Sequence, residues 1–273
     1  KTQMLVKSTG QKSDLPKKAK AQIAVLNHLK TQNGFIAVQS LGEFASNPVD
    51  VCRKLSGKNL IEIKLEPIIP DLTGFSFKPM FKKIRFSGYQ KSAVDKICTS
   101  LDKNEFTPFL LHGVTGSGKT EIYIEAARHA ISQGKTVIML LPEISLTPQI
   151  AGRFRSVFGD EVAMWHSKLN QSARAWTWKR ICAGDYKVVI GARSAIFSPL
   201  KNLGLIVVDE EQENSYKQES PAPRYHARDV SLMRGKIHNA TVVLASATPS
   251  LESYYNYIQG KFEYIHLPER YGG

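Results

Sequence analysis

The spacing of hydrophobic residues changes at about residue 86 and divides the chain into two parts. In the first part, residues 17–31 place apolar side chains at helical spacing, which predicts an amphipathic helix. A shorter helix is expected over 38–45, and Asn47, followed by a proline, supplies the cap of a third. Residues 60–66 alternate between apolar and polar side chains, as in a strand with one exposed face.

Three short helices and a strand in a basic segment predict a small winged helix-turn-helix domain over 17–70. A flexible lead-in is expected at 1–16, where no periodicity is visible, and a proline-punctuated linker at 71–85. The third helix of such a domain often contacts DNA, and its polar side would carry Lys54 and Lys58. Domains of this kind also contact proteins, and the pattern does not choose between the two partners.

From residue 86 onward, segments with strand and helix patterns alternate. A helix is expected over 89–101, and strands are expected at 107–112, 136–141, 162–166, 186–191, 204–209, 241–246 and 262–267. Several of these strands are continuous apolar runs, which is typical of a parallel sheet buried on both faces. The segment 86–273 is therefore predicted to be an α/β domain with a largely parallel sheet.

A glycine-rich stretch joins the first of these strands to the next helix. Its glycines allow backbone amides to point at phosphate oxygens, and the helix N-terminus adds a positive field. Lys119 is expected to reach the β- and γ-phosphates, and the Thr120 hydroxyl to hold Mg²⁺. The predicted nucleotide contacts in this loop are Gly113, Thr115, Gly116, Ser117, Gly118, Lys119 and Thr120.

Two further strand ends carry polar residues that suit the same site. Asp209 and Glu210 follow an apolar strand, an arrangement in which the aspartate holds Mg²⁺ and the glutamate orients an attacking water. With Lys119 they form the predicted catalytic set. Ser246 and Thr248 end the strand at 241–246 and could sense the γ-phosphate, although a plain exit from the strand explains them equally well.

Charge and cysteine content narrow the class of protein. The net charge is +13, and residues 1–85 carry 15 Lys and Arg against 6 Asp and Glu. This excess suggests a polyanionic partner, most simply nucleic acid, with a lysine-rich solvated surface as the alternative. Three widely separated cysteines without a CxxC pair fit a reducing cytosol and leave no zinc ribbon in the chain. The sequence contains no run of about 18 apolar residues, so no transmembrane helix is predicted.

The three motifs, in this order and spacing, resemble motifs I, II and III of superfamily-two helicases. Further stretches narrow the resemblance to the bacterial replication-restart helicases, densely over 86–273 and more loosely over 1–70. These stretches are LLPEISLTPQ (140–149), WHS (165–167), GARSAIF (191–197), DEEQENSYKQ (209–218), PRYHARDV (223–230), SATPSLES (246–253) and LPERYGG (267–273). The resemblance implies a RecA-like first helicase lobe behind the winged helix.

The resemblance also implies roles for single residues. Gln90 matches the family's adenine-reading glutamine, and Phe86 stands where a side chain can pack near the base. Residues 214–226 match an aromatic-rich loop that links single-strand binding to ATP hydrolysis, with aromatic faces for bases and cations for phosphates. The residues implied to contact DNA or to couple it to ATP are Pro142, Glu143, Thr147, Gln149, Arg193, Ser194, Tyr216, Lys217, Arg224, Tyr225, Ser246 and Thr248.

For a complete protein, the resemblance implies ATP-driven 3′→5′ translocation and unwinding of stalled or branched forks during replication restart, with ATP and Mg²⁺ as cofactors. The implied partners are DNA, replication-restart proteins and single-strand-binding proteins. The resemblance also implies a monomer that works in the bacterial cytoplasm, at the nucleoid, and does not bind a membrane. The family's second lobe, arginine finger and zinc ligands would lie beyond Gly273. The chain alone is therefore expected to bind nucleotide, to hydrolyse it slowly and not to unwind DNA.

One residue departs from the family pattern. Motif II of the family ends in histidine, whereas this chain has Gln212, which puts the coupling of motif II to motif III in question. Two alternatives to the helicase remain: a nucleotide-gated module that binds DNA or protein, and another superfamily-two DNA translocase. DNA-stimulated ATPase activity distinguishes a motor lobe from a binding module.

Overall fold

The computed structural model describes residues 2–11, 15–16, 18–32, 34–67, 86–146, 148–167 and 169–270, with backbone only at 2, 3, 66, 67, 148, 149 and 151. The chain divides into two compact units, Lys1–Asp71 and Leu72–Gly273. The linker predicted at 71–85 lies outside the described residues.

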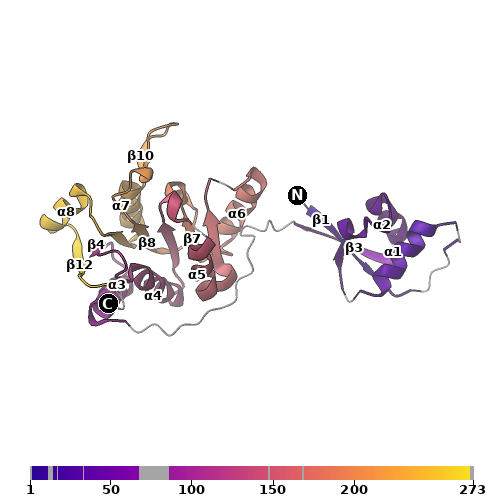
Figure 1. Cartoon of the computed structure of the whole chain (residues 1–273), viewed down its shortest axis with the longest axis horizontal. Coiled ribbons are helices and arrows are strands. Elements are labelled where there is room, and N and C mark those ends of the chain that lie inside the picture. The colour runs from indigo at the N-terminus through magenta and orange to yellow at the C-terminus, as the bar shows by residue number, and fades with distance from the viewer. Residues whose placement is uncertain are drawn as a thin grey trace. The chain divides into compact units, whose positions relative to one another are not determined.

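The first unit combines a small antiparallel sheet with two α-helices (Figure 1). Its sheet has the order β2-β1-β3. The elements are β1 (Thr2–Ser8), α1 (Lys20–Lys30), β2 (Ile36–Ala37), the 3-10 helix η1 (Val38–Leu41), α2 (Pro48–Ser56) and β3 (Ile61–Pro67). The Asn47 side chain accepts a hydrogen bond from the Asp50 amide and caps α2, as its sequence predicts.

Three expectations for this unit are corrected by the structure. The segment expected to be a flexible lead-in contains β1, which pairs with β3 along its whole length and buries Val6 completely. Its apolar residues are only Met4, Leu5 and Val6, between polar residues on both sides, and so short a run shows no strand periodicity. The helix expected over 38–45 is only the 3-10 helix Val38–Leu41. Lys58 follows the end of α2, whereas Lys54 lies on its exposed side and pairs with Asp50 at 2.8 Å. The winged-helix assignment stays a prediction.

The second unit is a seven-stranded parallel sheet with helices on both faces. Its strands are β4 (Pro108–Gly113), β5 (Thr136–Leu140), β6 (Val162–Trp165), β7 (Val188–Gly191), β8 (Leu203–Asp209), β11 (Thr241–Ser246) and β12 (Glu263–Leu267). Their order is β12-β4-β11-β8-β5-β7-β6, and every pairing in it is parallel. All seven strands predicted from the sequence are confirmed, as is the α/β class of this unit.

Helices cover the two faces of the sheet in two groups. One face carries α3 (Gly88–Lys103), α4 (Lys119–Ser132) and α5 (Pro148–Phe158), and the other α6 (Gln171–Ala183), α7 (Ala227–His238) and α8 (Leu251–Ile258) (Figure 1). Each group forms its own hydrophobic core with alternate residues of the strands. Burial on both faces explains why the strands are continuous apolar runs. In the described part of the chain, no helix is long and apolar enough to span a membrane.

Short elements lie in the connections. They are the 3-10 helices η2 (Glu143–Ser145), η3 (Gly159–Glu161), η4 (Arg193–Phe197) and η5 (Asn214–Tyr216), and the two-stranded hairpin β9 (Lys217–Gln218) and β10 (Tyr225–His226). The hairpin is the aromatic-rich segment that the sequence singles out. It follows β8 and precedes α7, so it leaves the sheet from the same edge as the acidic pair.

The strand order brings the three sequence motifs together. Strand β11 lies between β4 and β8, and the register places Ala245 beside Asp209 and Ser246 beside His112. Because the strands are parallel, the ends that carry the glycine-rich loop, the acidic pair and Ser246 share one edge of the sheet. Ligands of open α/β sheets bind at this carboxyl edge.

Candidate nucleotide-binding site

The glycine-rich loop between β4 and α4 has the geometry of a phosphate cradle. Gly116 and Gly118 adopt φ values of +82° and +81°, which a side chain would strain. The ammonium of Lys119 donates to the carbonyl oxygen of Gly113 at 2.9 Å and so crosses the mouth of the loop. A lysine held there, at the start of a helix, is placed to meet phosphate oxygens.

Two features of the loop fit a bound phosphate group. A Cβ atom at Gly113 would lie 2.7 Å from the hydroxyl oxygen of Ser117, so the close turn requires glycine. That Ser117 hydroxyl is buried and has no hydrogen-bond partner among the described residues. Thr120 lies half-buried in the first turn of α4, where its hydroxyl could join a Mg²⁺ ion held with the phosphates.

The acidic pair lies at the end of β8, facing the loop. Glu210 has φ of +47°, which turns the chain sharply after the strand. Its carboxylate lies 3.7 Å from the Lys119 ammonium. The carboxylate of Asp209 accepts a hydrogen bond from the Tyr123 hydroxyl at 2.8 Å. Asp209 and Thr120 are therefore the residues that could hold Mg²⁺, while Glu210 remains available to orient a water molecule.

Burial dominates the electrostatics of Asp209. Desolvation raises the pKa of this carboxyl from 3.8 to about 6, although the hydrogen bond from Tyr123 opposes the rise. A divalent cation would favour the ionised form, because it would add positive charge next to the buried carboxyl. In the described residues, no group of three or more His, Cys, Asp or Glu side chains is placed to hold a metal ion by itself.

Gln212 joins the acidic pair to the end of β11. Its amide nitrogen donates to the Glu210 carboxylate at 3.0 Å, and its amide oxygen accepts from the Ser246 hydroxyl at 2.6 Å. The same Ser246 oxygen accepts from the backbone amide of Thr248 at 2.8 Å. An amide can donate on one side and accept on the other. Gln212 therefore makes the contact between motifs II and III that the absence of histidine had put in question.

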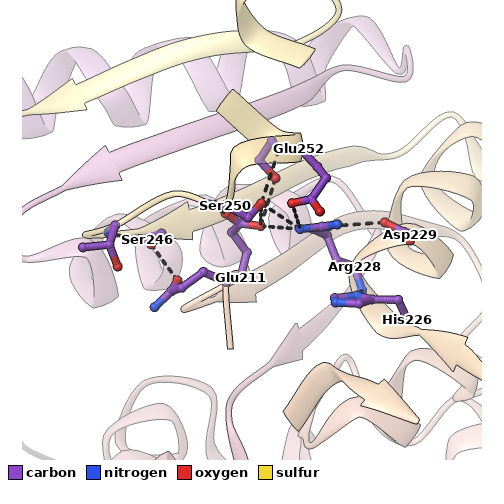
Figure 2. Close-up of polar contacts among 10 residues, drawn as sticks. Glu211, His226, Arg228, Asp229, Ser246, Ser250 and Glu252 are labelled. Carbon is purple, nitrogen blue, oxygen red and sulfur yellow. Dashed lines mark hydrogen bonds and ion pairs between the residues drawn. The ribbon is translucent and has the colours of Figure 1, made fainter. Parts of the chain in front are cut away.

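A buried cluster around Glu211 supports the same strand ends. Figure 2 shows Arg228 between Glu211 and Asp229, with Ser250 and Glu252 beside it. Glu211 is fully buried and accepts from the Ser250 amide at 2.6 Å and from the Arg228 guanidinium at 3.3 Å. The sequence did not predict Glu211 and Arg228 as site residues, because only the fold brings α7 and the start of α8 to the acidic motif. A run of three acidic residues after a buried strand was the available signal.

The two residues predicted to lie near the adenine base, Gln90 and Phe86, make contacts within the protein. Gln90 is 2% exposed; its amide oxygen accepts from the Ser87 amide at 2.9 Å and its amide nitrogen donates to the Ser117 carbonyl at 2.8 Å. It thus caps α3 and holds the glycine-rich loop. Phe86 packs, half-buried, against the core beside it. The role of both residues in reading adenine stays a prediction.

Some of the residues predicted to contact DNA are exposed, and others form hydrogen bonds within the protein. Glu143 is exposed on η2, after Pro142, and accepts a hydrogen bond from Ser167. Arg193 is engaged: its guanidinium donates to the carbonyls of Ser215 at 3.3 Å and Lys217 at 3.0 Å, and so anchors the aromatic hairpin. The Ser194 hydroxyl accepts a hydrogen bond from the Trp165 indole. Thr147 and the side chain of Gln149 lie outside the described residues.

One predicted residue of the aromatic-rich segment is buried. Tyr216, expected to contact DNA or to couple it to ATP, is 1% exposed, and its hydroxyl donates to the backbone carbonyl of Asp209 at 2.6 Å. Its ring is therefore not available to stack on a base, and its coupling role stays a prediction. Sequence pattern cannot separate this buried tyrosine from its exposed neighbours. Lys217 and Arg224 are exposed, and Tyr225 is half-buried against Phe197 with ring centroids 5.0 Å apart. The contact of these three residues with DNA stays a prediction.

A family profile decides the class of this chain. The profile described as DEAD/DEAH box helicase matches residues 87–256, which hold every motif of the site. The chain belongs to the DEAD/DEAH box helicase family. This membership confirms the resemblance to superfamily-two helicases found in the motifs, and it places a helicase lobe on the seven-stranded sheet.

Among curated proteins, the chain is similar to replication restart proteins named PriA. The chain is 43% identical over 250 residues to the replication restart protein PriA of Chlamydia pneumoniae, covering 92% of this chain and 33% of that protein. It is 48% identical over 194 residues to PriA of Bacillus subtilis (strain 168), covering 70% and 24%. The chain thus spans about a quarter to a third of these relatives. A RecG structure bound to a three-way DNA junction shares the fold, with a TM-score of 0.53 and 24% identity over 70% of this chain and 25% of that one.

The burial of Asp209 leads to a stability prediction. Because the folded pKa is raised, the carboxyl contributes most stability below about pH 4 and this contribution is lost as the pH rises through about 6. Asp209→Asn is therefore expected to raise the free energy of unfolding by on the order of 1–3 kcal/mol at about pH 8, and much less at about pH 4. Urea unfolding in EDTA measures both values. Asp160→Asn, at an exposed carboxylate, is the matched control; equal effects of Asp209→Asn at the two pH values would contradict the prediction.

Proposed function

We propose that this chain forms the ATP-binding half of a DNA-translocating motor. One observation carries the proposal: a continuous set of polar contacts runs from Lys119 through Glu210 and Gln212 to Ser246. It joins the phosphate loop, the acidic pair and the end of β11. Membership of the DEAD/DEAH box helicase family supports hydrolysis of ATP at this site.

The proposed reaction is hydrolysis of ATP: water attacks the γ-phosphorus, the bond from it to the β–γ bridging oxygen breaks, and ADP leaves. The loop amides and Lys119 would hold the phosphates, with Thr120 and Asp209 as the residues for Mg²⁺. The ion, when bound, would neutralise charge that develops on the phosphate oxygens. Glu210, held by Gln212 on one carboxylate oxygen and facing Lys119 with the other, would orient the water and accept its proton.

The proposed DNA track lies on the loops of the same sheet edge. Lys217 and Arg224 are exposed cations on or next to the hairpin, and Arg193 ties the hairpin to η4. Exposed cations beside aromatic rings suit the phosphates and bases of a single strand. Tyr216, which immediately precedes the hairpin, holds the backbone of Asp209, so DNA on the hairpin and ATP at the acidic pair would act on neighbouring atoms.

Similarity to PriA supports a place in replication restart. We propose that a protein containing this chain moves 3′→5′ on DNA at stalled or branched forks, and that it works with replication-restart and single-strand-binding proteins. The RecG structure carries a three-way DNA junction, a branched substrate of the kind proposed here. The first unit, with its net positive charge and the exposed Lys54 and Lys58, would contact the duplex as a winged helix.

ATPase assays of the 273-residue chain, with and without single-stranded or forked DNA, test this function. We expect measurable hydrolysis that DNA stimulates, and a loss on the order of 100-fold in Lys119→Ala, because the phosphates lose their principal cation. Lys201→Ala, at an exposed lysine of the same unit, is the control. Nucleotide binding without any effect of DNA on hydrolysis would favour a binding module over a motor.

The bridge made by Gln212 leads to a separate prediction. Gln212→Ala removes both hydrogen bonds between Glu210 and Ser246 and should lower DNA-stimulated hydrolysis about tenfold or more, with nucleotide affinity little changed. Gln212→His, which can still donate and accept, should retain most of the stimulation. Steady-state kinetics with saturating DNA measure both, and Gln133→Ala, at an exposed glutamine, is the control. Equal stimulation in Gln212→Ala and the parent would rule the bridge out as a coupling element.

A further inference from the structure

A tyrosine outside the recognised motifs contacts the carboxylate expected to hold the metal ion. Tyr123 lies in α4, is 1% exposed, and donates its hydroxyl proton to one carboxylate oxygen of Asp209 at 2.8 Å. The ring belongs to the core formed by α3, α4 and the sheet. A buried phenol needs a partner for its hydroxyl, and this partner lies in the site.

The position of Tyr123 in the sequence explains its reach. It follows Lys119 by four residues, so the two side chains lie on one face of α4, one turn apart. The first turn sends the lysine to the phosphate loop, and the next sends the phenol to the end of β8. One helix thus positions both the phosphate-binding cation and the carboxylate opposite it.

Asp209 is held at its other end by a second tyrosine. The Tyr216 hydroxyl donates to the Asp209 backbone carbonyl at 2.6 Å, and Tyr216 is also 1% exposed. The main chain of Asp209 is therefore fixed from the hairpin side and its carboxylate from the α4 side. A carboxylate held by a fixed donor loses its freedom to rotate, which is how the partners of metal ligands raise metal affinity.

We infer that Tyr123 is a positioning residue that orients the Asp209 carboxylate toward Mg²⁺ bound with the nucleotide. The inference rests on the proposed nucleotide site. It assigns a function to a hydroxyl that core packing alone does not require, because phenylalanine would fill the same volume.

Tyr123→Phe removes the hydroxyl and leaves the ring. The 273-residue chain would be titrated with a fluorescent, non-hydrolysable ATP analogue, first in EDTA and then over a range of Mg²⁺ concentrations. In Tyr123→Phe, the Mg²⁺ concentration that gives half of the metal-dependent gain in affinity should rise about tenfold. Affinity in EDTA should stay within about twofold of the parent, because the phosphate loop is untouched.

Tyr186→Phe is the matched control. Tyr186 is 4% exposed in the same unit, and its hydroxyl accepts from Arg180 at 3.4 Å, away from Asp209. This variant should lose a hydrogen bond without changing the Mg²⁺ dependence. Thermal unfolding of both variants separates a loss of stability from a change in metal binding, and electron paramagnetic resonance of Mn²⁺ with the analogue gives a second measure of metal affinity that needs no fluorescence.

Each result decides the matter. An unchanged Mg²⁺ dependence in Tyr123→Phe, an equal shift in Tyr186→Phe, or an equal loss of affinity with and without metal would overturn the inference. A Tyr123→Phe chain that fails to fold would assign the hydroxyl to the core and overturn it too. A parent chain that binds no nucleotide would overturn the proposed function along with the inference, whereas normal parent binding with an unchanged variant would overturn the inference alone.

Discussion

The parallel pairing of β11 with both β4 and β8 is the constraint on which the site depends. It places the ends of three strands side by side, so the phosphate loop, the acidic pair and Ser246 are brought together by the sheet itself. The two hydrophobic cores hold that sheet from both faces. Buried strands cannot shift in register without exposing apolar side chains, and the positions of Lys119 and Asp209 are therefore fixed by packing.

Within this frame, the site concentrates polar groups at a cost to stability. Burial raises the pKa of Asp209, and Glu211 lies wholly inside the protein with Arg228 and two serine hydroxyls as partners. A buried charge is tolerated only when such partners satisfy it. The partners of the acidic motif come from α4, η5, α7 and the start of α8, so this motif is the point where these elements are joined. Figure 2 shows the part of this arrangement around Glu211 and Arg228.

The sequence predicted the parts of this arrangement that follow from local pattern. Seven strands were foreseen because each is a buried apolar run, and the glycine-rich loop because its spacing is diagnostic. Tyr216 was misplaced, since a tyrosine in a polar loop looks the same whether it faces solvent or the core. The contacts of Tyr123 and Glu211 were missed because their partners lie between 17 and 86 residues away along the chain and only the fold brings them together. Strand β1 was missed because its apolar run is only three residues long, too short to show a strand period.

Hydrogen–deuterium exchange with and without a non-hydrolysable ATP analogue and Mg²⁺ tests the central claim most directly. If the loop, the acidic motif and the end of β11 form one connected site, the ligand should slow amide exchange together at 113–121, 209–213 and 246–250. Lys119→Ala should abolish all three effects. Protection confined to 113–121 would contradict the account, because it would show that phosphate binding does not reach Glu210, Gln212 and Ser246.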